Sequence, residues 1–417
     1  MPPAPPSSAP PRPDPTGTVA RHDAHMSINY GRYPVVMDRG EGCRLWDADG
    51  KAYLDLFAGF GAPVLGHCHP ELVDALYAQA RRLWHVGNLL HTDPQTRAAE
   101  WIAKLGFGGR SFFCHSGADA NEAAFKLARL YGKANPRDAA GPHGRFKVIS
   151  CTKSFHGRSF ATMGATANPK VREGFGPLLP GYTNVAYDDI DALRHAVDRE
   201  TVAVIAEPVQ GEGGVNVPDP VYFKALRTLC DERDLLLICD EVWTGCGRTG
   251  RTFAHQHWGI EPDIMTLGKG VGGGLAVGVM CAQPRVAEHF NALTQGGVKH
   301  ATTLGGNCLA MAVTAKIFEV IDRDGLCARA ADLGEHAKRV MSGWTDAGVR
   351  AVRGHGLFLG LQLNGRDDGP AVVRRALDAG LLINATQGDV LRIAPPITIT
   401  REELDEGLER LEAVLRR

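Results

Sequence analysis

The sequence lacks the long apolar run that a membrane-spanning helix requires, and it has no excess of charge of either sign. Its 46 basic and 47 acidic residues leave a formal net charge of -1, so nothing attracts the chain to nucleic acid or to an anionic membrane. The N-terminus also lacks the apolar core of a secretory signal. We therefore expect a globular protein with no nucleic-acid or membrane partner.

Paired cysteines are missing as well. The ten cysteines form no CxxC pair and no zinc-finger spacing, so the sequence indicates no metal site. Scattered cysteines in a chain of 417 residues are typical of reduced thiols that pack as small apolar groups. This usage predicts a cytoplasmic location.

The domain organisation follows from composition and periodicity. The proline-rich start predicts a disordered arm over residues 1–24. From residue 111 onward, helix-period stretches alternate with apolar runs of strand length, which predicts an α/β fold with a buried parallel sheet. These runs are 111–114, 146–150, 202–206, 235–239, 264–267 and 277–282.

Both ends of the ordered chain differ from this pattern. RLWDADGKAYLDL resembles a hairpin around DADG, and TREELDEGLERLEAVL is an amphipathic helix that Thr400 and Glu403 begin as a capping box. We expect a large domain over residues 76–305. Residues 25–75 and 306–417 are expected to combine into a second, smaller domain.

Three segments carry candidate chemistry. Asp240 follows the apolar run LLLIC, and ligands bind open α/β sheets just outside the carboxyl ends of the strands. Lys269 follows another run in IMTLGKGVGGG, where a poorly hydrated amine could form a Schiff base with an aldehyde. Between a strand and a helix, Ser116, Gly117 and Ala118 form an anion-binding turn without the GxGxxG pattern.

Each segment also has an ordinary explanation. Asp240 could belong to a turn that caps the next helix, Lys269 could be a solvated loop lysine, and residues 116–118 could be a plain turn between a strand and a helix. In combination they match the needs of pyridoxal phosphate. Its phosphate needs backbone amides, its ring nitrogen needs a carboxylate and its aldehyde needs a lysine. A carboxylate such as Asp240 keeps the ring nitrogen protonated, so that the ring accepts electrons from the breaking substrate bond.

The chain resembles the class III pyridoxal-phosphate aminotransferases of fold type I, in the acetylornithine and ornithine aminotransferase group, over about residues 28–415. The motifs that carry the resemblance are YGRYPVVMDRGEGCRLWDADGKAYLDL, GHCHPELVDAL, SGADANEAAFKLAR, SFHGRS, EPVQGEGGV, DEVWTGCGRTG, PDIMTLGKGVGGGL, TTLGGNCLA and LRIAPPITIT. The resemblance implies a large domain with a mostly parallel sheet of seven-stranded type flanked by helices. A smaller α+β domain built from both termini and a homodimer with the active site at its interface are also implied.

The resemblance assigns the cofactor residues. Lys269 would hold the cofactor and move the proton in catalysis, and Asp240 would pair with the ring nitrogen. Glu241, which belongs to the same cofactor-binding segment, is expected to hold structure. The other implied cofactor contacts are Phe155 and Val242 on the ring faces, Gly117 and Ala118 at the phosphate, and Thr303 at the phosphate of the neighbouring subunit.

The resemblance also assigns substrate residues. Arg158 would bind the donor α-carboxylate. Glu212 would hold Arg392 aside for the long ω-amino substrate and release it for 2-oxoglutarate or glutamate. Thr302 and Tyr30 would lie near the substrate. A structural ion pair and a surface arginine are the ordinary alternatives for these charged residues.

Trp243 departs from the family pattern, which usually has Gln at this position to bond the phenolic oxygen of the cofactor. An indole has one N–H donor and no acceptor, so it could replace only the donor role; otherwise its bulk would narrow the pocket. Smaller departures are Asp119 for Glu and Cys308 for Pro. None of these changes removes a catalytic group.

The group leaves a choice of amino donor. Asn384 in LLINATQGDVLRIAPP and His156 in SFHGRS resemble the members that act on N-acetylornithine. The expected reaction converts N-acetylornithine and 2-oxoglutarate into N-acetylglutamate 5-semialdehyde and glutamate, a step of arginine biosynthesis. Ornithine, 4-aminobutyrate and succinyldiaminopimelate remain alternative donors. A pyridoxal-phosphate epimerase, aminomutase or decarboxylase would keep Lys269 and Asp240 but would not need the Glu212–Arg392 pair.

Overall fold

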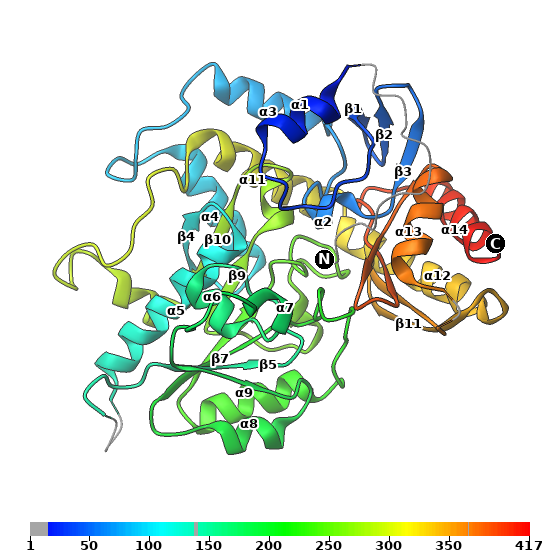
Figure 1. Ribbon diagram of the computed structural model, residues 1–417. Coiled ribbons are helices and arrows are strands. Elements are labelled where there is room, and N and C mark those ends of the chain that lie inside the picture. The colour runs from blue at the N-terminus through cyan, green and yellow to red at the C-terminus, as the bar shows by residue number, and fades with distance from the viewer. Residues whose placement is uncertain (1–15, 137–140, 366) are drawn as a thin grey trace.

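The computed structural model describes residues 16–136, 141–365 and 367–417 (Figure 1). Residues 1–15 of the predicted arm lie outside the described residues. The prediction of disorder is wrong for the end of that arm, because Thr18–His25 form helix α1. The prolines stop at residue 15, and the eight residues of α1 contain neither proline nor glycine. The ordered chain therefore begins earlier than the composition suggested.

A seven-stranded sheet forms the centre of the larger part of the molecule, in the order β4-β10-β9-β8-β7-β5-β6. Within this sheet, only β10 runs against the other strands, so the predicted mostly parallel sheet is confirmed. Its strands are β4 (Arg110–Cys114), β5 (Lys147–Cys151), β6 (Tyr182–Val185), β7 (Thr201–Ala206), β8 (Leu236–Asp240), β9 (Ile264–Leu267) and β10 (Gly278–Ala282).

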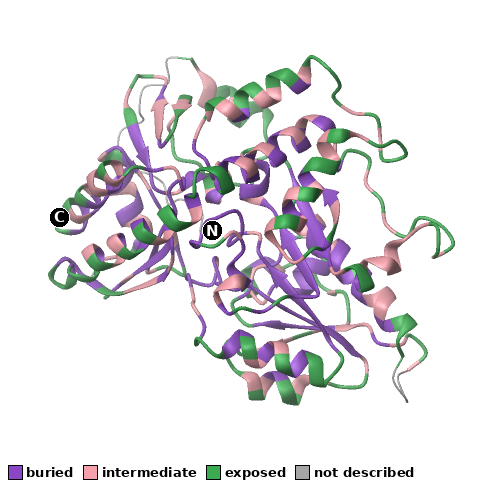
Figure 2. Cartoon of the chain, turned by 180° about the vertical axis from the view of Figure 1, so that it is seen from behind, coloured by how far each residue is buried: buried purple, intermediate pink, exposed green. Residues whose placement is uncertain are grey.

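Helices cover both faces of this sheet, which is why its strands have continuous apolar sequences. Helices α5 (Gly117–Ala134) and α6 (Phe160–Ala165) pack on one face, and α8 (Ile190–Ala196) and α9 (Tyr222–Glu232) pack on the other (Figure 1). Along β8, Leu236 and Ile238 face α5, whereas Leu237 and Cys239 face α9. Figure 2 shows that the strands are buried and that the outer helix surfaces are exposed.

Two four-stranded sheets belong to the smaller part. The first contains β1 (Met37–Glu41), β2 (Arg44–Asp47), β3 (Ala52–Asp55) and β13 (Leu381–Leu382), and the second contains β11 (Val349–His355), β12 (Phe358–Leu363), β15 (Val390–Ile393) and β14 (Asn384–Thr386). Strands β2 and β3 form the predicted hairpin. Because β13 pairs with β3, both ends of the chain share one sheet, as expected. The limits proposed for the domains remain predictions.

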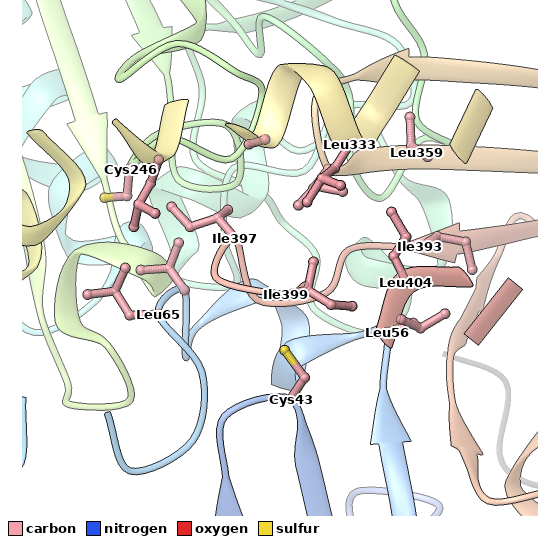
Figure 3. Packing of buried hydrophobic residues seen from close by; sticks show 14 of the residues in the cluster. Cys43, Leu56, Leu65, Cys246, Leu333, Leu359, Ile393, Ile397, Ile399 and Leu404 are labelled. Carbon is pink, nitrogen blue, oxygen red and sulfur yellow. The ribbon is translucent and has the colours of Figure 1, made fainter. Parts of the chain in front are cut away.

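The remaining helices surround these sheets, and in the described ranges none is long and apolar enough to cross a membrane. They are α2 (Ala58–Gly61), α3 (Pro70–Ala80), α4 (Asp93–Leu105), α7 (Pro169–Arg172), α10 (Pro284–Ala287), α11 (Cys308–Arg323), α12 (Leu326–Ser342), α13 (Gly369–Asp378) and α14 (Arg401–Leu415). Thr400 and Glu403 cap α14 reciprocally, as predicted. Figure 3 shows Leu56, Ile399 and Leu404 in the apolar cluster that joins the N-terminal strands to this helix.

Candidate active site

Three strands of the large sheet bring distinctive residues to the same edge. Strand β4 leads into Ser116 at the start of α5, β8 ends at Asp240, and β9 is followed by Lys269. A cavity of about 490 Å³ lies at this edge. It is lined by these residues predicted from the sequence: Gly117, Ala118, Phe155, Arg158, Asp240, Val242 and Lys269.

Asp240 is buried, and several donors hold its carboxylate. Asn121 Nδ2 donates to Oδ2 at 2.8 Å, and His156 Nδ1 lies 2.7 Å from the same oxygen. The Val242 amide donates to Oδ1 at 3.1 Å. Thr266 Oγ1 donates to Asn121 Oδ1 at 2.7 Å, so the amide group of Asn121 is itself held in one orientation. These contacts hold the Asp240 side chain in one orientation in an enclosed wall of the cavity.

Lys269 begins a short 3₁₀ helix, η2 (Lys269–Gly272), with a positive φ of 48°. This backbone conformation is uncommon for a side-chain-bearing residue and is typical of functional positions. Burial lowers the pKa of the Lys269 amine to about 8, with Glu212 opposing and Arg392 adding to the shift. About a tenth of the amine is therefore neutral and nucleophilic at pH 7, far more than for an ordinary lysine.

The N-terminus of α5 offers free backbone donors. Ser116 Oγ accepts a hydrogen bond from the Asp119 amide at 3.2 Å, whereas the amides of Gly117 and Ala118 have no acceptor among the described residues. A Cβ on Gly117 would lie 2.6 Å from Val242. Only glycine fits here, and it keeps the backbone open to an anion at the positive end of the helix.

Arg158 and Phe155 lie together at the cavity. The Arg158 guanidinium is exposed, lies 5.7 Å from the centre of the Phe155 ring and has no ion pair with any described residue. The Phe155 amide donates to Glu207 Oε1 at 2.9 Å, which fixes this segment. Burial raises the pKa of the Glu207 carboxyl to about 7. Arg158 is thus available for an incoming carboxylate.

Glu212 and Arg392 form the predicted ion pair. Arg392 Nη1 donates to Glu212 Oε1 at 2.8 Å, and Nη2 donates to Asn384 Oδ1 at 2.7 Å. Burial alone would raise the pKa of the Glu212 carboxyl, but Arg392 and Lys269 together lower it below its ordinary value. The pair lies behind Trp243, outside the residues that line the cavity.

Besides Glu212, Arg392 and Trp243, four predicted site residues lie away from the cavity lining. Glu241 accepts hydrogen bonds from the amides of Ala254 and His255 at 2.8 and 2.7 Å, which is the expected structural role. Tyr30 is 60% exposed and is not brought to the cavity. Thr302 Oγ1 lies 3.1 Å from His115 Nε2, and Thr303 is exposed outside the cavity.

Sequence reasoning missed the residues that support Asp240. Asn121 lies one helical turn after Gly117, on the side of α5 that faces the cavity, and this spacing could have indicated its role. His156 directly follows Phe155, but its contact with Asp240 joins segments distant in sequence. Glu207 directly follows the apolar strand β7, a position similar to that of Asp240 at the end of β8, and this signal could have indicated it.

The residues present fit pyridoxal phosphate. Free amides stand at a helix N-terminus, a fixed carboxylate lies in the cavity wall, and a lysine with a lowered pKa lies beside it. The supporting observation is that the Gly117 cradle has no room for a side chain.

Comparisons with known proteins agree with this geometry. The family described as "Aminotransferase class-III" matches residues 25–415. An acetylornithine aminotransferase from Caldanaerobacter subterraneus is 44% identical over 94% of this chain and 97% of its own length. The N-acetylornithine aminotransferase structure from Stenotrophomonas maltophilia has a TM-score of 0.80 and 34% identity, covering 95% of this chain and 98% of that one. An ornithine aminotransferase structure from Toxoplasma gondii, described with PLP at its active site, has a TM-score of 0.87 and 34% identity, covering 96% and 94%.

Proposed function

The chain belongs to the class III aminotransferases, and we propose that it transfers the terminal amino group of N-acetylornithine to 2-oxoglutarate. The products are N-acetylglutamate 5-semialdehyde and glutamate. Support comes from the acetylornithine aminotransferases that match nearly the whole chain at 39–44% identity. The main structural support is the position of Lys269. Its amine lies at the cavity and close to the Glu212–Arg392 pair.

The cofactor is pyridoxal 5'-phosphate, which supplies an aldehyde for amine exchange and a ring that accepts electrons. Asp240 would pair with the ring nitrogen and keep its proton in place, because Asn121 and His156 fix its buried carboxylate. Lys269 would hold the cofactor through its amine, and the same amine would accept and return the proton at the substrate carbon. The Gly117 and Ala118 amides would hold the phosphate.

Substrate recognition uses the two arginines differently. Arg158 has no ion pair among the described residues and binds the α-carboxylate of the donor. Arg392 stays paired with Glu212 while the donor is bound, and binds the second carboxylate when 2-oxoglutarate or glutamate enters. One cavity can in this way accept two substrates with different charge distributions.

The amino donor can be tested spectroscopically. Adding N-acetylornithine alone should reduce the visible absorbance of the lysine-bound cofactor, and 2-oxoglutarate should restore it. Ornithine and 4-aminobutyrate are the comparison amines, and K269A is the matched control, which should show neither covalent attachment nor turnover. A holoenzyme whose absorbance ignores all three amines, or normal turnover by K269A, would contradict the proposal.

Ornithine is the second candidate donor, because ornithine aminotransferases are among the similar structures. Succinyldiaminopimelate shares the acyl-diamino-acid shape of N-acetylornithine. Faster loss of absorbance with ornithine than with N-acetylornithine, at equal concentrations, would favour the second candidate. An epimerase or aminomutase would not need 2-oxoglutarate to recover its starting absorbance.

We also infer a homodimer in which Thr303 reaches the cofactor phosphate of the partner. Support comes from two exposed apolar side chains, because Leu89 and Leu293 are each 95% exposed. Leu89 follows Asn88, whose Nδ2 donates to the Thr302 carbonyl at 3.1 Å, so this leucine lies near Thr303. Mixed dimers of K269A and T303V chains would each contain one intact site and should recover activity that neither variant has fully. A monomer in sedimentation experiments would contradict the inference. A cytoplasmic location remains a prediction, which the ten free cysteines support.

A further inference from the structure

Trp243 occupies a tightly fitted place behind the cavity. Its indole is 6% exposed and stacks on Phe358, with ring centres 4.8 Å apart and an angle of 12° between the planes. A Cβ on Gly61 would lie 2.5 Å from the indole, and a Cβ on Gly211 would lie 2.8 Å from it. The two glycines therefore leave space that the indole fills, and the ring cannot turn without moving the backbone around it.

Two cations lie over this ring. Lys269 Nζ is 4.3 Å from the ring centre and Arg392 Cζ is 4.6 Å from it. Both distances are well inside the range of a cation–π attraction, which is stronger when the charge is removed from water. The Arg392 guanidinium also lies 5.9 Å from the Phe57 ring and 5.8 Å from the Phe60 ring. Aromatic rings thus enclose this arginine.

All these contacts belong to one position of Arg392. In that position the side chain is fully buried, its Nη1 is bonded to Glu212, and its Nη2 is bonded to Asn384. The Trp243 N–H is buried without a hydrogen-bond partner among the described residues, so the indole contacts Arg392 through its ring face.

We propose that Trp243 is a positioning residue that holds Arg392 in its pair with Glu212 and thereby weakens the binding of dicarboxylic substrates. A substrate with one carboxylate at Arg158 leaves the pair intact. Arg392 is fully buried and does not line the cavity, so the second carboxylate of a dicarboxylate such as 2-oxoglutarate would have to draw it away from the indole. Losing one desolvated cation–π contact changes an equilibrium on the order of tenfold. The inference rests on the proposed function, because that function assigns the second carboxylate to Arg392.

The test compares two replacements of similar size. W243L removes the aromatic face, whereas W243F keeps it. The probe is glutarate, an unreactive five-carbon dicarboxylate, and its affinity for each holoenzyme is measured by titration calorimetry. We expect W243L to bind glutarate about tenfold more tightly than the wild type. We expect W243F to bind it within about threefold of the wild type, because the phenyl face keeps the attraction.

Two controls distinguish a specific effect of Trp243 on Arg392 from general damage to the structure. Pentanoate has a single carboxylate, so its affinity should be unchanged in W243L. W258F alters another buried tryptophan, 5% exposed and packed on Phe223 away from the cavity, and should leave glutarate binding unchanged. In steady-state kinetics, W243L should lower the KM for 2-oxoglutarate and leave the KM for the donor nearly constant.

Equal glutarate affinity in the wild type, W243L and W243F, with normal circular dichroism, would overturn the inference. So would a gain in glutarate binding that W243F shares fully with W243L, since the aromatic face would then be irrelevant. Failure of the proposed function is distinguishable, because it would appear as a wild-type enzyme that transfers no amino group to 2-oxoglutarate.

Discussion

Replacing Lys269 by methionine should stabilise the cofactor-free protein at neutral pH. The pKa of this amine is about 8 in the folded chain and about 10.4 when unfolded. Burying this amine therefore costs free energy at any pH at which the amine of the unfolded chain is protonated. The cost is fully present below about pH 8 and disappears as the pH rises through about 10.4, because the unfolded state binds more protons in this window.

The difference of about 2.4 between these two pKa values corresponds to about 3 kcal/mol at pH 7, at 1.36 kcal/mol per pKa unit. At pH 9.5 the remaining cost is about 1 kcal/mol. Both figures are upper values, because the cavity leaves Lys269 partly exposed to water. Methionine has a similar length and no charge, so K269M should remove the cost while largely filling the same space.

Urea unfolding of the cofactor-free wild type and K269M, at pH 7 and at pH 9.5, measures the difference. The free energy of unfolding of K269M should exceed that of the wild type, and the excess should shrink by more than half at the higher pH. K170M, which alters an exposed lysine, is the matched control and should change little at either pH. A K269M protein that is less stable at pH 7, or an excess that does not depend on pH, would refute a buried and destabilised amine.

Further substitutions test the rest of the site. D240N should retain the cofactor but lower kcat at least about 100-fold, because a neutral amide cannot hold the proton on the ring nitrogen; activity within about threefold of the wild type would contradict this role. R158Q should raise the KM for the donor by about 10- to 100-fold with a smaller change in kcat, and steady-state kinetics would show it. G117A should weaken cofactor binding because the new Cβ would meet Val242, and G117A/V242A should recover part of the affinity in equilibrium dialysis.

Much of the large domain could be predicted from the sequence. Strands buried on both faces have uninterrupted apolar sequences, and β7 and β8 are buried along their whole length. Strand β6 was missed because it lies at the edge of the sheet, where Tyr182 and Asn184 are only half-buried. An edge strand needs fewer apolar residues, so its sequence resembles a loop.

The site was predictable where one residue acts through its own local position. Asp240 and Lys269 follow apolar strands, and the parallel order of those strands brings them together. The residues that hold Asp240 in place could not be predicted in this way. Local spacing places Asn121 on the cavity side of α5, but its contact with Asp240, like that of His156, forms only after three separate segments have packed. The family resemblance also placed Tyr30 near the substrate, but this chain leaves it exposed.

The pairing of β3 with β13 has a consequence for synthesis of the chain. Leu54 finds its partner Leu381 only when almost the whole protein has been made. At roughly 5–20 residues per second, the ribosome needs on the order of 20 to 60 s to make the intervening chain. During that time the edge of β3 offers unpaired backbone groups to other chains. The N-terminal hairpin is therefore the segment of the nascent polypeptide that we expect a chaperone to shield.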